Sequence, residues 1–166
     1  MKDFYEIDFL PVGETTSGDA ITMRYRVNGE VKIHLVDGGY KNTSETLISN
    51  VNKYYEYPDK INSVLVTHSD RDHAGGLIEV INSFEIDCVW MNRPWLYADE
   101  LVERFSRYTN ADSLRKKLKE AYPVIAEIEE ICEQKDIPIY EALQGKRVDG
   151  HIKILAPSKQ RYLDLI

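Results

Sequence analysis

Cysteine is scarce in this sequence, long apolar runs are missing, and basic residues are outnumbered. The two cysteines, Cys88 and Cys132, lie far apart and form no CxxC pair, which excludes a disulfide framework and a zinc ribbon. No stretch approaches the roughly 20 consecutive apolar residues that a membrane span requires. The N-terminal stretch MKDFYEIDFL carries acids and lacks the basic start and small-residue cleavage site of a secretory signal. We therefore expect a cytoplasmic protein with no membrane segment.

The charge balance is acidic. The chain has 21 Lys and Arg against 28 Asp and Glu, a formal net charge of −7. Such a balance argues against a broad surface that coats nucleic acid. Carboxylates that bind metal are part of this count, however, and they no longer repel phosphate once a cation is bound. The charge therefore weakens a nuclease hypothesis without excluding it.

The order of apolar patterns predicts an α/β fold. A length of 166 residues suits one domain spanning 1–166. Three alternating segments come first, and Asn28-Gly29 between the second and third is a strong hairpin signal. Helical and short buried-strand patterns then alternate, which predicts a mixed sheet flanked by helices. The expected strands are 5–10, 20–27, 31–36, 61–67, 86–90, 137–140 and 151–157, and the expected helices are 44–57, 76–84 and 94–135, the last broken near Pro123.

The segment VTHSDRDHAGG, residues 66–76, concentrates metal-binding side chains behind a buried strand. In an extended chain alternate side chains share one side, so His68 and Asp70 can converge on one cation. Asp72 has the same spacing from Asp70, while His73 points elsewhere and can serve a second ion. Imidazole with carboxylate suits zinc, manganese or iron. Alternatively, the loop is merely polar and Asp72 caps the helix that follows.

Two divalent ions bound side by side would explain such a cluster. A cation pair lowers the pKa of a bridging water and holds the oxygens of a phosphoester or acyl substrate. The double glycine Gly75-Gly76 lets the backbone approach the site closely. This segment is therefore the candidate active site.

The spacing His68-x-Asp70-x-Asp72-His73-x-Gly75-Gly76 resembles the motif of the metallo-β-lactamase fold superfamily, whose usual form has histidine in place of Asp70. With FLPVGETTSGDAI upstream and VDGG at 36–39, it is similar to the branch that includes the C-terminal domain of the ComEC DNA-uptake proteins. The resemblance covers residues 6–80 and, more weakly, ILAP at 154–157. It implies a metallo-β-lactamase-like αβ/βα sandwich with a dinuclear site at the sheet edges.

The resemblance also implies roles for single residues. His68 and Asp70 would hold the first ion, and Asp72 and His73 the second, with Asp72 also the catalytic residue. Asp37 would orient one of these ligands. Asp19 would lie near the site.

A metal-dependent hydrolase is the function that the resemblance implies. We expect it to cleave phosphodiesters, in a nucleic acid or a small nucleotide, by a metal-bound hydroxide. The alternatives are an acyl, thioester or lactone hydrolase of the same fold, and a non-catalytic module that binds metal or a partner.

The resemblance extends over only the first half of such a domain. The superfamily completes its site with a bridging acid and a further histidine from the second αβ half, and residues 158–166 contain no histidine and, besides Asp164, no acid. We therefore expect a domain truncated after its first half, a poor enzyme alone, with the remaining ligands supplied by the missing half or by another chain. Apolar sheet surfaces left exposed would favour a homo-oligomer.

Arg71 and Trp95 have two interpretations each, and two histidines outside the motif have one each. Arg71 lies inside the motif and could meet a substrate phosphate or point to solvent. Trp95 follows a buried strand and could line a substrate groove or belong to the core. His34 is expected on a sheet face, and His151 at a turn fits no ligand position. A basic cluster follows in the long helical region and is expected to be a solvated face: Arg115, Lys116, Lys117 and Lys119.

Overall fold

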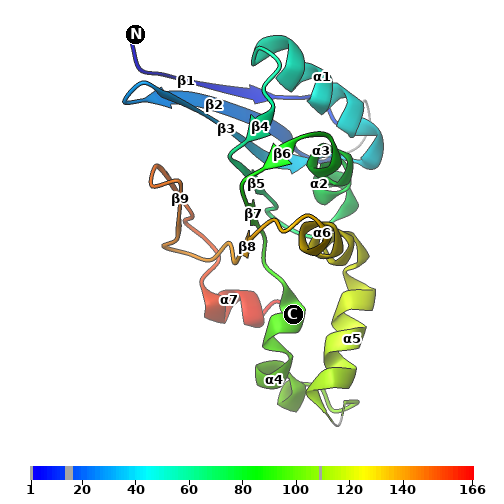
Figure 1. Ribbon diagram of the computed structural model, residues 1–166. Coiled ribbons are helices and arrows are strands. Elements are labelled where there is room, and N and C mark those ends of the chain that lie inside the picture. Colours follow the sequence, from blue (N-terminus) through cyan, green and yellow to red (C-terminus); the bar gives the residue numbers. More distant parts are fainter. Residues whose placement is uncertain (1, 14–16, 109) are drawn as a thin grey trace.

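The computed structural model describes residues 2–13, 17–108 and 110–166 (Figure 1). Its centre is a mixed six-stranded sheet in the order β1-β2-β3-β5-β7-β8. The first three strands pair antiparallel, and β3, β5, β7 and β8 pair parallel. This confirms the predicted α/β class. The strands are β1 Phe4–Phe9, β2 Ala20–Val27, β3 Glu30–Gly38, β5 Ser63–Leu65, β7 Val89–Trp90 and β8 Ile139–Tyr140.

The turn between β2 and β3 is the predicted two-residue hairpin. Asn28 and Gly29 have φ values of 53° and 86°, and Val27 pairs with Glu30. Positive φ at both central positions is the type I′ turn that suits the twist of paired strands. This hairpin fixes the register of the antiparallel part of the sheet.

Helices connect the parallel strands and cover one face of the sheet (Figure 1). Their apolar sides form the core, in which Leu47, Val51 and Leu77 are fully buried. Ser44 is the first residue of α1 and not its cap, because its hydroxyl donates to the Lys41 carbonyl (2.8 Å). The elements of this layer are η1 Lys41–Thr43, α1 Ser44–Tyr54, α2 Arg71–Ala74, α3 Leu77–Ser83 and the short pair β4 Lys60–Ile61 and β6 Glu85–Ile86.

The region after β7 is helical and is broken at Pro123, as predicted. Its elements are η2 Pro94–Tyr97, α4 Ala98–Leu101, η3 Val102–Arg104, α5 Ala111–Ala121 and α6 Pro123–Gln134. The apolar side chains of α5 and α6 that face the core include Leu114, Leu118, Ile125 and Ile128, whereas Ala121 is exposed and Ile131 is half-buried. Pro123 starts a new helix whose buried stripe runs through Ile128 and Cys132, so Ile131 lies beside that stripe.

The C-terminal segment differs from the predicted strand 151–157. Only β10, Ile152–Lys153, is extended, paired with β9, Arg147–Val148. Helix α7, Lys159–Leu163, follows. It begins behind Ser158, whose hydroxyl accepts from the Arg161 amide (3.2 Å). This capping serine is a sequence signal that the strand prediction overlooked.

The β9–β10 hairpin lies against the other face of the sheet, where Val148 packs with Leu65 and Trp90. The β1 end of that face carries exposed apolar side chains: Tyr5 is 83% exposed and Phe9 75%. In the described part of the chain, no helix has the length and apolar character needed to cross a membrane.

Candidate metal centre

The histidine and aspartate cluster lies where β5 ends and α2 begins. The amides of His73 and Ala74 both donate to the Asp70 carbonyl (3.0 and 2.8 Å), so the chain turns into a helix directly after Asp70. The predicted extended alternation from Asp70 to Asp72 is therefore wrong. The turn brings His73 back onto His68, and the two ring centroids are 3.8 Å apart.

The cluster forms two His–Asp pairs. His68 Nε2 is 3.7 Å from Asp70 Oδ2, and His73 Nε2 is 3.8 Å from Asp72 Oδ2. Two ligand atoms on one cation lie at most about 4 Å apart, because each is about 2 Å from the ion. Both spacings therefore allow each pair to share an ion. This is the pairing that the sequence resemblance implies.

Protein atoms occupy the other nitrogen of each ring. His68 Nδ1 is 3.0 Å from Thr67 Oγ1, and His73 Nδ1 is 2.9 Å from Asp37 Oδ2. An acceptor at Nδ1 keeps the proton there and leaves Nε2 as the ligand atom. Both rings thus present Nε2 toward the carboxylate of their own pair.

Asp37 is the buried anchor of this arrangement. It is 1% exposed at the end of β3 and adopts a φ of 56°, a conformation that costs a non-glycine residue energy and is found at functional sites. One carboxylate oxygen accepts from the Thr67 amide (2.8 Å), and the other from the Thr67 hydroxyl and His73 Nδ1.

Asp37, His68 and His73 each offer a ligand atom within 4.8 Å of the others. Because both oxygens of Asp37 are already engaged, this geometry suits orienting His73 better than binding an ion directly. Thr67 was not singled out from the sequence. The sequence signal that could have identified Thr67 is a hydroxyl-bearing residue placed between the end of a strand and a candidate metal-binding histidine.

Two glycine segments let the strand end approach the motif. A Cβ on Gly76 would lie 2.1 Å from the Gly38 carbonyl oxygen, and the Gly76 amide donates to Gly39 (2.9 Å). Asp19 lies near the site, with Oδ2 3.7 Å from His73 Nδ1. Its amide donates to the Asp72 carbonyl (3.3 Å). These contacts hold Asp19 and the VDGG turn beside α2.

The two candidate substrate-binding residues differ. Arg71 is exposed and lines a cavity of about 730 Å³ together with Lys41 and Glu127. Trp95 is 1% exposed and its indole nitrogen donates to Glu129 Oε1 (3.0 Å). Trp95 is therefore a core residue, and the prediction that it lines a substrate groove is wrong. Its burial results from packing beneath α5 and α6.

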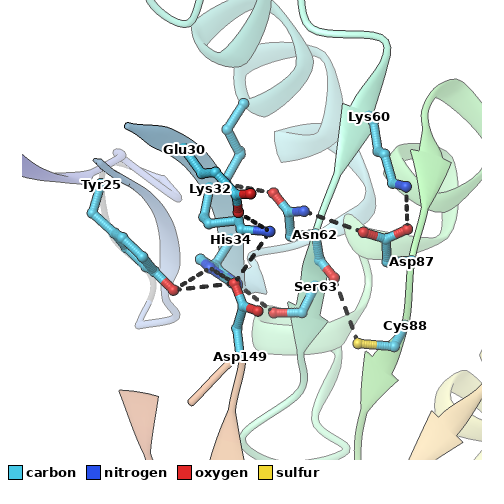
Figure 2. A network of polar contacts seen from close by, with 11 residues as sticks. Tyr25, Glu30, Lys32, His34, Lys60, Asn62, Ser63, Asp87, Cys88 and Asp149 are labelled. Atoms are coloured by element: carbon cyan, nitrogen blue, oxygen red, sulfur yellow. Dashed lines mark hydrogen bonds and ion pairs between the residues drawn. The ribbon is translucent and has the colours of Figure 1, made fainter. Parts of the chain in front are cut away.

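A second polar cluster lies on the opposite face of the sheet (Figure 2). His34 is fully buried, with Nδ1 2.6 Å from Ser63 Oγ and Nε2 3.2 Å from the Tyr25 hydroxyl. The Tyr25 hydroxyl donates to Asp149 Oδ2 (3.3 Å), which joins the β9–β10 hairpin to the sheet. Burial lowers the pKa of His34 to about 4 and raises that of Tyr25 to about 12. His151 packs edge-on against Tyr25 and not against the motif.

No protein-family model matches the chain, and no curated protein matches it. Solved structures similar to it in part include a hydrolase, AbOPH, of the β-lactamase superfamily (16% identity, TM-score 0.44, covering 76% of this chain and 45% of that one). Another is a metallo-β-lactamase HARLDQ motif mutant from Cronobacter sakazakii (13% identity, TM-score 0.38, covering 49% and 31%). A third is the Rm3 metallo-β-lactamase (21% identity, TM-score 0.38, covering 48% and 29%). The chain thus spans less than half the length of each of these structures.

Proposed function

We propose that this chain carries the metal site of a metal-dependent hydrolase that cleaves phosphodiesters. The observation that supports it most is the convergence of His68, Asp70, Asp72 and His73 as two pairs beside the buried Asp37. Histidine nitrogens and carboxylate oxygens fit zinc, manganese or iron. Divalent ions held there would lower the pKa of water and polarise a substrate oxygen.

The residues of the chain have distinct tasks in this proposal. Asp37 holds the proton on His73 Nδ1, so that Nε2 stays free as a ligand atom. Asp72 lies at the start of α2 with its side chain 21% exposed, next to His73 and open to substrate. Its carboxylate would bind an ion and be the group whose loss harms activity most. The fold around Gly38 and Gly76 keeps these groups at fixed positions.

The choice of phosphodiesters is supported by charge beside the motif. Arg71 begins α2, and Lys41 lies in η1; both line the same cavity. Two cations against one carboxylate, that of Glu127, favour an anionic substrate group such as a phosphate. A nucleotide or nucleic-acid strand is the substrate class that the sequence resemblance implies. The acidic chain as a whole favours a small substrate over a long one.

Hydrolysis of an acyl ester, thioester or lactone is the second candidate. It is favoured by a neutral, largely apolar cavity that reaches His68 from the side of α7. The same ions would polarise a carbonyl oxygen instead of a phosphoryl oxygen.

Elemental analysis of protein purified without chelator tests the metal site first, beside the double variant Asp70→Ala/His73→Ala. We expect close to two equivalents of zinc, manganese or iron, lost in the variant. No bound metal after reconstitution would overturn the proposal for this chain.

Hydrolysis of bis-p-nitrophenyl phosphate, set against a thioester and a lactone, then separates the two reaction classes. Loss of activity in Asp72→Asn with metal still bound to the other pair would support the hydrolase. A metal-loaded protein that cleaves none of these would indicate a non-catalytic binding module.

A further inference from the structure

A cavity of about 410 Å³ is lined by His68 and is separate from the cavity that Lys41 lines. Its walls come from several separate parts of the chain. Thr67 and His68 follow β5, Asn92 follows β7, and Ile125 lies in α6. Tyr162 of α7 also lines the cavity. The cavity therefore lies at the carboxyl ends of two parallel strands, where α/β sheets gather ligands.

The cavity lacks charged side chains among the residues that the structure describes, apart from the titratable His68 at its mouth. Burial raises the pKa of the Tyr162 phenol far above its ordinary value, so this wall is neutral as well. Most of the remaining wall is apolar and includes Pro94, Ile125 and Pro157. A phosphate or carboxylate would leave water here without gaining a cation, which is costly.

Asn92 is one of the neutral polar side chains of the wall, together with Thr67, Ser69, Tyr122 and Tyr162. Its amide nitrogen donates to the Ala142 carbonyl (3.2 Å), and its side-chain oxygen is buried with no partner among the described residues. A buried acceptor without a donor is rare and costs free energy. Because this oxygen is buried, a bound ligand contacts other atoms of the wall, and the unpaired acceptor disfavours an anionic group nearby.

We propose that this cavity binds an uncharged, apolar group of the substrate, an alkyl chain or an aromatic ring, and so places the scissile ester beside His68. The inference rests on the proposed hydrolase function and narrows its substrate to small molecules with one apolar side. A volume of about 410 Å³ falls within the range of small-ligand sites, which are mostly apolar with few polar groups. A polynucleotide, charged at every residue, does not match this lining.

Binding to metal-free protein tests the cavity independently of catalysis. Hexanamide and benzamide, which are neutral and carry an N–H donor, would be titrated into chelator-treated protein and followed by NMR at the Asn92 side-chain amide. The variant Ala156→Trp places a large ring at the cavity rim, where Ala156 is an exposed lining residue. Leu155→Trp is the matched control, because Leu155 is 72% exposed and does not line the cavity.

We expect binding by the wild type and by Leu155→Trp, with at least a tenfold weaker affinity in Ala156→Trp. Whichever of hexanamide and benzamide binds more tightly shows whether the cavity prefers an alkyl chain or an aromatic ring. Absence of a shift at Asn92 with both amides, or equal affinity in Ala156→Trp, would overturn the inference.

A chain-length series of alkyl p-nitrophenyl phosphates, with the matching p-nitrophenyl carboxylates, connects the cavity to turnover in metal-loaded protein. Each added methylene should raise kcat/KM roughly threefold to fourfold until the cavity is full, and Ala156→Trp should flatten the series. Amide binding without any hydrolysis would reject the hydrolase and keep the cavity. Hydrolysis whose kcat/KM does not depend on chain length and is unchanged in Ala156→Trp would support the hydrolase function and reject the proposal that the cavity binds the substrate.

Discussion

His73 Nδ1 lies 2.9 Å from Asp37 Oδ2, although 36 positions separate the two residues in the sequence. The contact joins the end of β3 to the short helix α2. It orients the ring of a candidate metal ligand. The amide and hydroxyl of Thr67 donate to the same carboxylate and hold it in place. The strand end, with its strained Asp37 backbone, therefore acts as the base of the candidate site.

Replacing Asp37 with asparagine should separate the orienting role from the structural one. Asparagine keeps the shape and tolerates positive φ, but it removes the charge that favours a proton on His73 Nδ1. We expect metal affinity to fall roughly 10–100-fold with little change in thermal unfolding. Competition with a chelator and a melting curve measure the two quantities.

The variant Asp37→Ala provides the contrast. It removes the acceptor of the Thr67 amide, a part-buried hydrogen bond, and should lower the free energy of unfolding by about 1 kcal/mol. Unchanged metal affinity in Asp37→Asn would show that Asp37 serves the fold alone.

Gly76→Ala should destabilise the whole protein. The added Cβ would lie 2.1 Å from the Gly38 carbonyl oxygen, so the contact between α3 and the strand end must open. We expect a loss of more than about 2 kcal/mol in urea unfolding, in the range of overpacked cores. Gly29→Ala is the control, since its Cβ would meet nothing within 4 Å and only the positive φ is strained. Its cost should be about 1–2 kcal/mol, and a smaller effect of Gly76→Ala would contradict the close approach.

The antiparallel half of the sheet was predictable because its signals are local. Asn28-Gly29 determines its own turn, and the alternation on both sides determines the strands. The break at Pro123 is local too. The burial of Trp95 could not be predicted from local signals, because a tryptophan after a buried strand suits a groove or a core equally well. What buries it is the packing of α5 and α6, which no short pattern specifies.

The candidate site was predictable in its residues and not in its shape. The letters of residues 68–73 show the metal-binding types, but DRDH suits an extended segment and a helical turn alike. In the structure two amides donate to the Asp70 carbonyl, so the segment forms a helical turn. This turn brings His68 and His73 together. Thr67 and Asn92 were not identified from the sequence because their contacts are with residues far along the chain, Asp37 and Ala142.

Metal removal should lower the melting temperature of the wild type. An ion that binds only the folded state stabilises it by about 2.7 kcal/mol at a free concentration 100 times the dissociation constant. Differential scanning calorimetry with and without EDTA measures the difference. Asp70→Ala/His73→Ala should melt at the same temperature in both buffers, and an EDTA effect that persists in this variant would place the metal elsewhere.

Acid should destabilise the protein through His34. Burial holds the pKa of His34 near 4 in the folded state, below the ordinary histidine value of 6.5. The nearby Asp149 opposes this shift, and Lys32 and His151 reinforce it. Below pH 6.5 the unfolded chain takes up a proton that the folded chain refuses. The contribution of neutral His34 to the free energy of unfolding is therefore complete above pH 6.5. It is lost as the pH falls toward 4, by at most about 1.4 kcal/mol per pH unit.

Urea unfolding of the wild type and of His34→Gln between pH 7.5 and 4.5 measures this contribution. The variant cannot titrate at this position, so the difference between the two proteins isolates His34 from the carboxylates that titrate in the same range. We expect the wild type to lose more stability than the variant over this range. Tryptophan fluorescence should report the opening early, because Trp90 packs with Val148 of the β9–β10 hairpin that Asp149 connects to Tyr25 and His34. Parallel pH curves for the two proteins would mean that the pKa of His34 is the same in the folded and unfolded states, which would contradict its lowering by burial.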